Sequence, residues 1–250
     1  MCLLLAAYRS CPGFRLVIAA NRDEYHARPT DAARFWHDYP HVLGGRDAEA
    51  NGTWLALDRA GRLATITNVP RGLDVGPSPR SRGLLVTDFL NSNSTAPDHL
   101  ESVARHGQQY QGFNLLAYDG SALCWYSNEA AVSQTLAAGT YTLSNASLHT
   151  PWPKTERLRT EFEALTLSNR DDTVDALLDV LSDRSSASAQ ASGDLREAIF
   201  IRGEHYGTRC SSVILIDDNG LLTFHERSYD SSATTTGDTR FSFELDPQPG

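Results

Sequence analysis

The sequence predicts an α+β fold, a four-layer αββα sandwich in which two antiparallel sheets stack and helices cover their outer faces. Three observations support this prediction. Short apolar runs occur in pairs around turns that contain Pro, Gly or Asn, which is typical of β-hairpins. The runs are apolar almost throughout, which indicates strands buried on both faces. Stretches with helical spacing fall between the hairpins, so strands and helices alternate in groups along the chain.

Four hairpins are predicted in chain order, followed by one more strand. The first turn is Ser10-Cys11-Pro12-Gly13, and the later turns each contain an Asp and a Gly. Such residues adopt the backbone conformations that tight turns need. The paired strands are expected at 3–8 and 14–20, 53–57 and 62–68, 113–118 and 123–127, and 212–217 and 221–226, with the last strand at 241–245.

Helices are predicted between the hairpins. The spacing of apolar residues predicts helices at 83–90, 97–109, 153–165 and 171–181. Pro153 suits the first turn of its helix. The Ser- and Ala-rich stretch at 182–194 is expected to be a mobile connection, and 229–239 a loop or wide turn. No internal repeat or composition break is evident, so residues 1–250 are expected to form a single domain.

Composition narrows the classes of function. The 250 residues carry 22 basic and 31 acidic side chains, a formal charge of −9, which argues against a general nucleic-acid surface. No apolar run has the roughly 18–20 residues of a membrane span, and no signal peptide is evident, so a cytoplasmic protein is expected. The four cysteines show no C-x-x-C spacing, which predicts neither zinc nor a disulfide framework. Lys154 is the only lysine, a bias attributed to a GC-rich genome.

The first hairpin places a cysteine beside polar residues. A turn centred between Cys11 and Pro12 would put Cys2 opposite Asn21, next to the polar tetrad Asn21-Arg22-Asp23-Glu24. Removal of Met1 would give Cys2 a free α-amine, whose intrinsic pKa of about 7.7–8.0 suits a base. One residue would then supply both nucleophile and base, with Arg22 favouring the thiolate and Asp23 orienting the amine. Alternatively, Cys2 is a small buried residue and the tetrad is a turn with a helix cap.

Further motifs strengthen the hypothesis of a catalytic cysteine. Met1-Cys2-Leu3 and the Asn-Arg-Asp-Glu tetrad resemble the NRDE family, also known as the transport and Golgi organisation protein two family. The resemblance continues in order along nearly the whole chain. The matching blocks are 1–5, 19–25, 28–29, 44–47, 52–55, 67–68, 79–83, 112–116, 143–145, 150–154 and 206–213.

The resemblance implies an N-terminal nucleophile hydrolase-like fold, which agrees with the hairpin pattern. It also implies a distant similarity to cysteine amidases that cleave penicillin V and conjugated bile acids. By that similarity Cys2 is the nucleophile and Asp23 orients its amine, while Arg22 is a looser match. Asn68 and Asn145 resemble oxyanion donors, and Arg209 resembles a distant arginine near the nucleophile. The two asparagines could instead satisfy turn backbone, and Arg209 could form a structural ion pair.

Two functions are compatible with these residues. The first is an N-terminal cysteine amidohydrolase that cleaves a linear C–N bond of a small acyl amide and needs no cofactor or metal. The second, implied by the family, is a trafficking chaperone for haem, or for acyl-CoA or lipid. Arg22, Arg46 and Arg209 would then pair ligand carboxylates. His26, His37 and His41 could approach haem iron or be exposed loop residues; no C-x-x-C-H attachment motif is present.

Overall fold

The computed structural model describes residues 2–70, 80–148, 150–167, 169–185 and 193–246. The chain divides into two compact units, each with one antiparallel sheet and its own helices. The first unit comprises Met1–Ala27, Ala138–Ser144 and Leu148–Glu244. The second comprises Arg28–Ala137, Asn145–Ser147 and Leu245–Gly250. Within the described residues no helix is both long and apolar enough to cross a bilayer.

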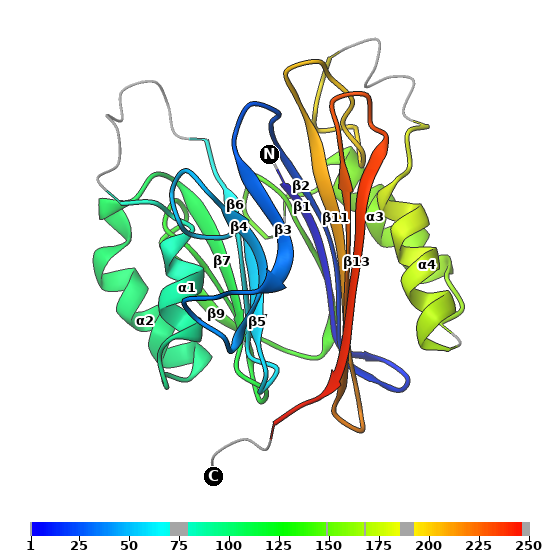
Figure 1. The fold of residues 1–250 in the computed structure, drawn as a ribbon. Coiled ribbons are helices and arrows are strands. Elements are labelled where there is room, and N and C mark those ends of the chain that lie inside the picture. Colours follow the sequence, from blue (N-terminus) through cyan, green and yellow to red (C-terminus); the bar gives the residue numbers. More distant parts are fainter. Residues whose placement is uncertain (1, 71–79, 149, 168, 186–192, 247–250) are drawn as a thin grey trace. The chain divides into compact units, whose positions relative to one another are not determined.

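The first unit contains a six-stranded antiparallel sheet in the order β10-β1-β2-β11-β12-β13 (Figure 1). The first hairpin therefore lies in the middle of this sheet, with β2 paired to β1 on one side and to β11 on the other. The strands are β1 (Cys2–Cys11), β2 (Phe14–Tyr25), β10 (Gly139–Leu143), β11 (Tyr206–Asp217), β12 (Leu221–Tyr229) and β13 (Thr235–Glu244).

Two helices, α3 (Pro153–Ala164) and α4 (Arg170–Leu181), cover one face of this sheet. Alternate strand residues such as Leu3 and Val213 pack there against the apolar side chains of α3 and α4. Because successive strand residues point to opposite faces, Cys2 and Leu4 face away from these helices. The burial of Leu3, Leu4 and Leu5 confirms that the strand is enclosed on both sides.

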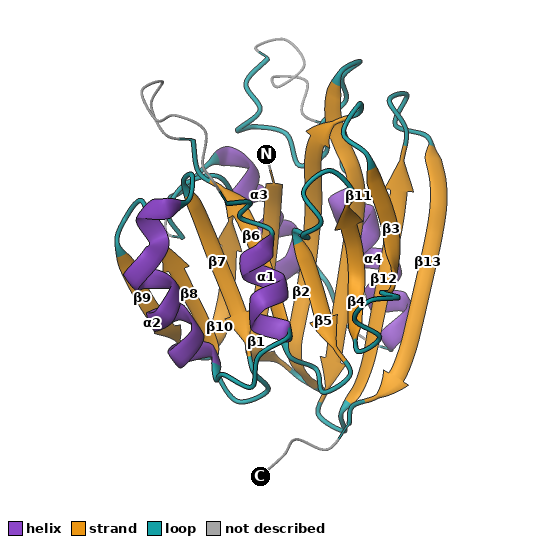
Figure 2. Cartoon of the chain, turned by 60° about the vertical axis from the view of Figure 1, so that its left-hand side comes forward, coloured by secondary structure: helices purple, strands orange, loops and turns teal. Residues whose placement is uncertain are grey.

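The second unit contains a seven-stranded antiparallel sheet in the sequential order β3 to β9 (Figure 2). Its helices pack on one face through Phe89, Leu100 and Val103, against strand residues such as Leu115. The strands are β3 (Thr30–Phe35), β4 (Val42–Asp47), β5 (Leu55–Asp58), β6 (Leu63–Asn68), β7 (Phe113–Tyr118), β8 (Leu123–Ser127) and β9 (Val132–Leu136). The helices are α1 (Leu84–Leu90), α2 (Ala96–His106) and the short 3-10 turn η1 (Gly107–Gln109).

The α+β class with two antiparallel sheets is confirmed, and so are the four hairpins and four helices. β7 and β8 have the predicted bounds. Four strands were not predicted, because half of the residues of β3 are polar, β4 contains two glycines, and β9 and β10 are short and carry several exposed or half-exposed residues. β13 already begins at Thr235, within the predicted loop. Of the predicted mobile connection, 186–192 lies outside the described residues, and the single-domain prediction stays a prediction.

The predicted register of the first hairpin is wrong by one residue. Cys2 lies opposite Arg22 rather than Asn21, because the pairing shifts between Tyr8 and Cys11. Arg9, inside that shift, adopts a left-handed conformation with φ of 48°, as residues in a β-bulge do. The polar tetrad also does not follow the strand, since β2 continues through Tyr25.

Candidate active site

Cys2 is the first residue of β1 and is half-buried. Its carbonyl accepts a hydrogen bond of 2.7 Å from the Ser144 hydroxyl, which follows β10. Its neighbour across the sheet on the other side is Arg22 of β2. The start of β1 is therefore held from both flanking strands.

Arg22 separates two cysteines across three adjacent strands. It lies opposite Cys2 of β1 and opposite Cys210 of β11, and directly opposed residues point to the same face. The Arg22 side chain is buried. Burial raises the pKa of Cys210 well above its usual range, and the nearby Glu226 carboxylate raises it further. Cys210 is therefore held as a thiol, which leaves Cys2 as the candidate nucleophile next to Arg22.

Asp23 lies one residue beyond Arg22, so its carboxyl points to the face covered by α3 and α4. It is only 2% exposed, and its Oδ1 accepts a hydrogen bond of 2.7 Å from Thr208 Oγ1. Burial raises the pKa of Asp23. Among the described residues, the charge of Lys154 opposes this rise most strongly, followed by the Thr208 hydrogen bond and then by Arg22.

Lys154 is a member of this site that sequence analysis missed. It lies in the first turn of α3, where a cation opposes the helix dipole, yet its side chain is 0% exposed. Nζ lies 5.6 Å from the centroid of the Trp152 ring, and no described residue accepts a hydrogen bond from it. Burial lowers the pKa of Lys154, whereas Asp23 and then Cys2 raise it. Lysine is rarely buried; in the sequence, Lys154 stood out only as the chain's single lysine and as the last residue of the matching block 150–154.

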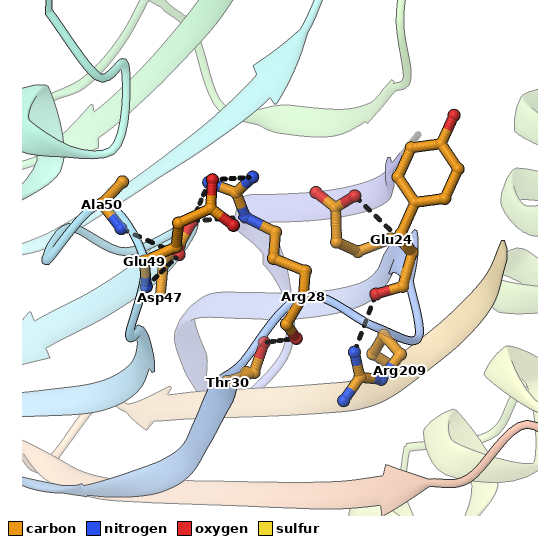
Figure 3. A network of polar contacts seen from close by, with 8 residues as sticks. Glu24, Arg28, Thr30, Asp47, Glu49, Ala50 and Arg209 are labelled. Carbon is orange, nitrogen blue, oxygen red and sulfur yellow. Dashed lines mark hydrogen bonds and ion pairs between the residues drawn. The ribbon is translucent and has the colours of Figure 1, made fainter. Parts of the chain in front are cut away.

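The tetrad divides into residues with different tasks. Asn21 is structural: its Nδ2 donates hydrogen bonds of 2.8 Å to the carbonyls of Leu181 and Ile199. Its Oδ1 accepts a hydrogen bond of 2.6 Å from Ser211. Glu24 is half-buried, and its Oε1 accepts the backbone N–H of Tyr25 (Figure 3). The buried charges of the tetrad are therefore Arg22 and Asp23, and the predicted helix cap is absent.

Arg209 lies on β11 where its pairing with β2 is irregular. Its Nη1 donates to the carbonyl of Tyr25 at 3.0 Å (Figure 3) and to that of His26 at 3.3 Å. Burial and the charge of Arg22 lower the pKa of Arg209. These contacts brace the end of β2, beyond the two buried charges, and they are to backbone carbonyls rather than to a carboxylate.

The two predicted oxyanion donors lie in the second unit and bond to each other. Asn68 ends β6, and its carbonyl accepts a hydrogen bond of 2.6 Å from Nδ2 of Asn145. Asn145 is buried. This bond is the backbone-satisfying role considered as an alternative for asparagine. A role of either side chain at an oxyanion stays a prediction.

Arg46 and His26, two of the residues expected to hold haem, have partners of their own. Arg46 binds Asp38 through two hydrogen bonds of 2.6 and 2.7 Å, and its guanidinium lies 4.4 Å from the Trp36 ring centroid. A ring nitrogen of His26 lies 3.1 Å from the Gly203 carbonyl. Arg28, which lies with Arg46 in the second unit, forms ion pairs with Asp47 and Glu49 (Figure 3). Among the described residues, no group of three His, Cys, Asp or Glu side chains could hold a metal.

Comparison with known proteins identifies the relatives of this chain. The family model described as "Transport and Golgi organisation 2" matches residues 1–231. A homologue of that name from Mus musculus is 36% identical, with 98% of this chain and 99% of the homologue covered. The Homo sapiens homologue is 35% identical over the same shares of the two chains. These matches confirm the predicted resemblance.

Solved structures identify the fold. A Caenorhabditis elegans N-acylethanolamine-hydrolyzing acid amidase ortholog superposes with a TM-score of 0.55, at 12% sequence identity. The superposition covers 85% of this chain and 92% of that chain. This similarity confirms the N-terminal nucleophile hydrolase-like fold.

Proposed function

This chain belongs to the Transport and Golgi organisation 2 family, and from that premise we propose that it is an N-terminal cysteine amidohydrolase acting on small acyl amides. The observation that carries the proposal is the set of buried charges around the start of β1. Arg22, Asp23 and Lys154 are all buried there, beside a half-buried cysteine. Removing charges from water is costly, and such clusters are characteristic of sites that tune protonation.

The arrangement supports a division of roles around Cys2. The α-amine, exposed once Met1 is removed, is the base, and Asp23 orients it. Arg22 lies on the same face as the thiol and stabilises the thiolate. The resemblance to cysteine amidases, and not the geometry around Cys2, makes Asn68 and Asn145 the candidate oxyanion donors. Loss of one such donor typically costs about 100- to 1,000-fold in rate.

Hydrolysis then proceeds in two balanced steps. The α-amine takes the thiol proton, and the sulfur attacks the amide carbonyl carbon. The S–C bond forms, the C–N bond breaks, and the leaving amine takes the proton back from the α-ammonium. Water attacks the thioester with the α-amine again as base, which releases the carboxylic acid and restores the thiol.

The name of the Caenorhabditis elegans neighbour supports an N-acylethanolamine as the first substrate to test. The alternative, a carrier of haem, acyl-CoA or lipid, is less well supported. Asp38 already accepts two hydrogen bonds from the Arg46 guanidinium, so a ligand carboxylate would compete with Asp38 for this arginine. The carrier hypothesis also uses Arg22 and Arg209, which lie in the first unit. Arg22 is buried there, and Arg209 donates a hydrogen bond to the end of β2.

The test is turnover of N-acylethanolamines by the full chain, with intact mass recorded first. We expect Met1 to be absent, a thioester adduct on Cys2 during turnover, and no adduct or amine release in Cys2→Ala. Cys11→Ala is the matched control, because Cys11 is a half-buried cysteine at the other end of β1. Retained Met1, or equal turnover in Cys2→Ala, would contradict the proposal. Haem binding unchanged in Cys2→Ala, without amide turnover in either form, would favour the carrier.

A further inference from the structure

Lys154 is a charged group for which neither the fold nor the proposed reaction has yet provided a role. Its side chain is wholly enclosed, at 0% exposed. No described residue accepts a hydrogen bond from Nζ, and the nearest described ring contact is Trp152. An ammonium buried without a bonded partner is strongly destabilising, so its retention needs a reason other than packing.

One segment of chain joins the backbone of Lys154 to Asp23. The carbonyl of Arg196 accepts the Lys154 N–H at 3.0 Å. Five residues further on, the Ile201 N–H donates to Thr208 Oγ1 at 2.9 Å, and the same hydroxyl donates to Asp23. Between them the Ile199 carbonyl accepts from Asn21. The segment 196–201 therefore connects the start of α3 to the Asp23 carboxyl through hydrogen bonds.

The charges around Lys154 are those of the candidate site. Asp23 acts on it most strongly, then Cys2, then Asp194. Asp194 is already bound by the Arg196 guanidinium, with a shortest contact of 2.6 Å. Asp23 in turn is influenced by Lys154 more than by Arg22. Asp23 is therefore the acid with which the buried ammonium is chiefly coupled.

We propose that Lys154 is a positioning residue of this site, whose ammonium keeps the buried Asp23 in its carboxylate form. A carboxylate accepts hydrogen bonds through both oxygens and attracts the amino group of Cys2 when that group is an ammonium, whereas the protonated acid is neutral and turns one oxygen into a donor. The ammonium acts through space, since no hydrogen bond joins it to Asp23. The catalytic use of this pair rests on the proposed function, but the coupling of Lys154 to Asp23 does not.

The single lysine makes the coupling directly measurable. Growth on 13C-lysine gives one ε-methylene signal, that of Lys154, and its shift follows the protonation of the amine. We expect a titration midpoint below 10.5 in the wild type, as burial dictates. Asp23→Asn should move the midpoint down by about one further pH unit, because an opposite charge is lost. A midpoint at the ordinary lysine value, or one that Asp23→Asn leaves unmoved, would overturn the proposal.

A second measurement separates charge from packing. In Lys154→Met the Asp23 carboxyl, followed by 13C NMR, should titrate about one pH unit higher than in the wild type, whereas Lys154→Arg should largely restore its midpoint. Arg157→Met is the matched control: it removes a cation from the same helix, where Arg157 pairs with Asp183. We expect no shift of Asp23 there. An unmoved Asp23 in folded Lys154→Met would overturn the proposal.

Different experimental outcomes contradict the proposed function and the proposed role of Lys154. If no amide is hydrolysed, the titrations still show whether Lys154 and Asp23 are coupled. If Cys2-dependent hydrolysis occurs but Lys154→Met shows the wild-type pH profile, the function stands and the positioning role is wrong. If both hold, the rising limb of the Lys154→Met profile should move to higher pH, because Asp23 then becomes a carboxylate only at higher pH.

Discussion

The Thr208 hydroxyl donates a hydrogen bond of 2.7 Å to the Asp23 carboxylate, and these two residues lie opposite each other on β11 and β2. The same hydroxyl accepts the backbone N–H of Ile201 at 2.9 Å. Both of its hydrogen-bonding directions are thereby used, which fixes its orientation. Asp23 is held by a buried group that belongs to the sheet framework.

Thr208→Val should therefore lower the free energy of unfolding and raise the pKa of Asp23. The Ile201 N–H would lose its acceptor and Asp23 a donor, at a cost of about 2–4 kcal/mol in the free energy of unfolding. The pKa of Asp23, already raised by burial, should rise further. Urea denaturation and a 13C titration of Asp23 measure the two effects. Thr208→Ser keeps the hydroxyl and is the control; equal behaviour of the two variants would contradict the prediction.

Asn21 gives a second prediction, because its side-chain amide donates to two buried carbonyls and accepts from the Ser211 hydroxyl. Asn21→Asp would place a carboxylate against the carbonyls of Leu181 and Ile199, to which Nδ2 now donates at 2.8 Å. We expect a loss of at least about 3 kcal/mol at pH 7. The folded state would favour the protonated acid, so the loss should shrink as the pH falls toward 4.

Urea denaturation of Asn21→Asp at several pH values, each compared with the wild type, measures this effect. Asn219→Asp makes the same chemical change at an exposed turn position and should cost less than about 0.5 kcal/mol. If Asn21→Asp were no worse than Asn219→Asp, the structural role of Asn21 would be refuted.

The fold could be predicted largely from local patterns, because hairpin turns and apolar runs are short-range features. The end of β2 could not, since Asn21, Arg22 and Asp23 are polar and yet buried within the strand. Their burial depends on β11, about 185 residues away, as the Asp23–Thr208 bond illustrates. Alternation of polar and apolar residues carries no information about such a distant partner.

The candidate site was predictable to the extent that it lies in the first hairpin. Cys2 and Arg22 were placed together by a turn, although the bulge near Arg9 shifted the register. Lys154 could not be found in this way. Its position at the start of a helix predicts exposure, yet its side chain is fully buried, and its backbone N–H donates to the distant Arg196 carbonyl.

His99 of α2 supplies a third prediction, on stability against pH. It is buried beside Phe89, with ring centroids 5.1 Å apart, and burial lowers its pKa from 6.5 to about 4. Between pH 6.5 and about 4, His99 therefore binds a proton in the unfolded chain but stays neutral in the folded chain. The stability contributed by the neutral ring is complete above that pH and is lost as the pH falls toward 4.

The size of this loss follows from the same two values. Between pH 7.5 and 4.5 we expect the free energy of unfolding to fall by about 2–3 kcal/mol through this residue. Urea denaturation of the wild type and of His99→Gln at the two pH values isolates the term, which the variant should lack. His106→Gln, an exposed position on the same helix, should behave as the wild type does. If His99→Gln lost as much stability on acidification as the wild type, His99 would not be the group responsible, and the protonation would have to occur elsewhere in the chain.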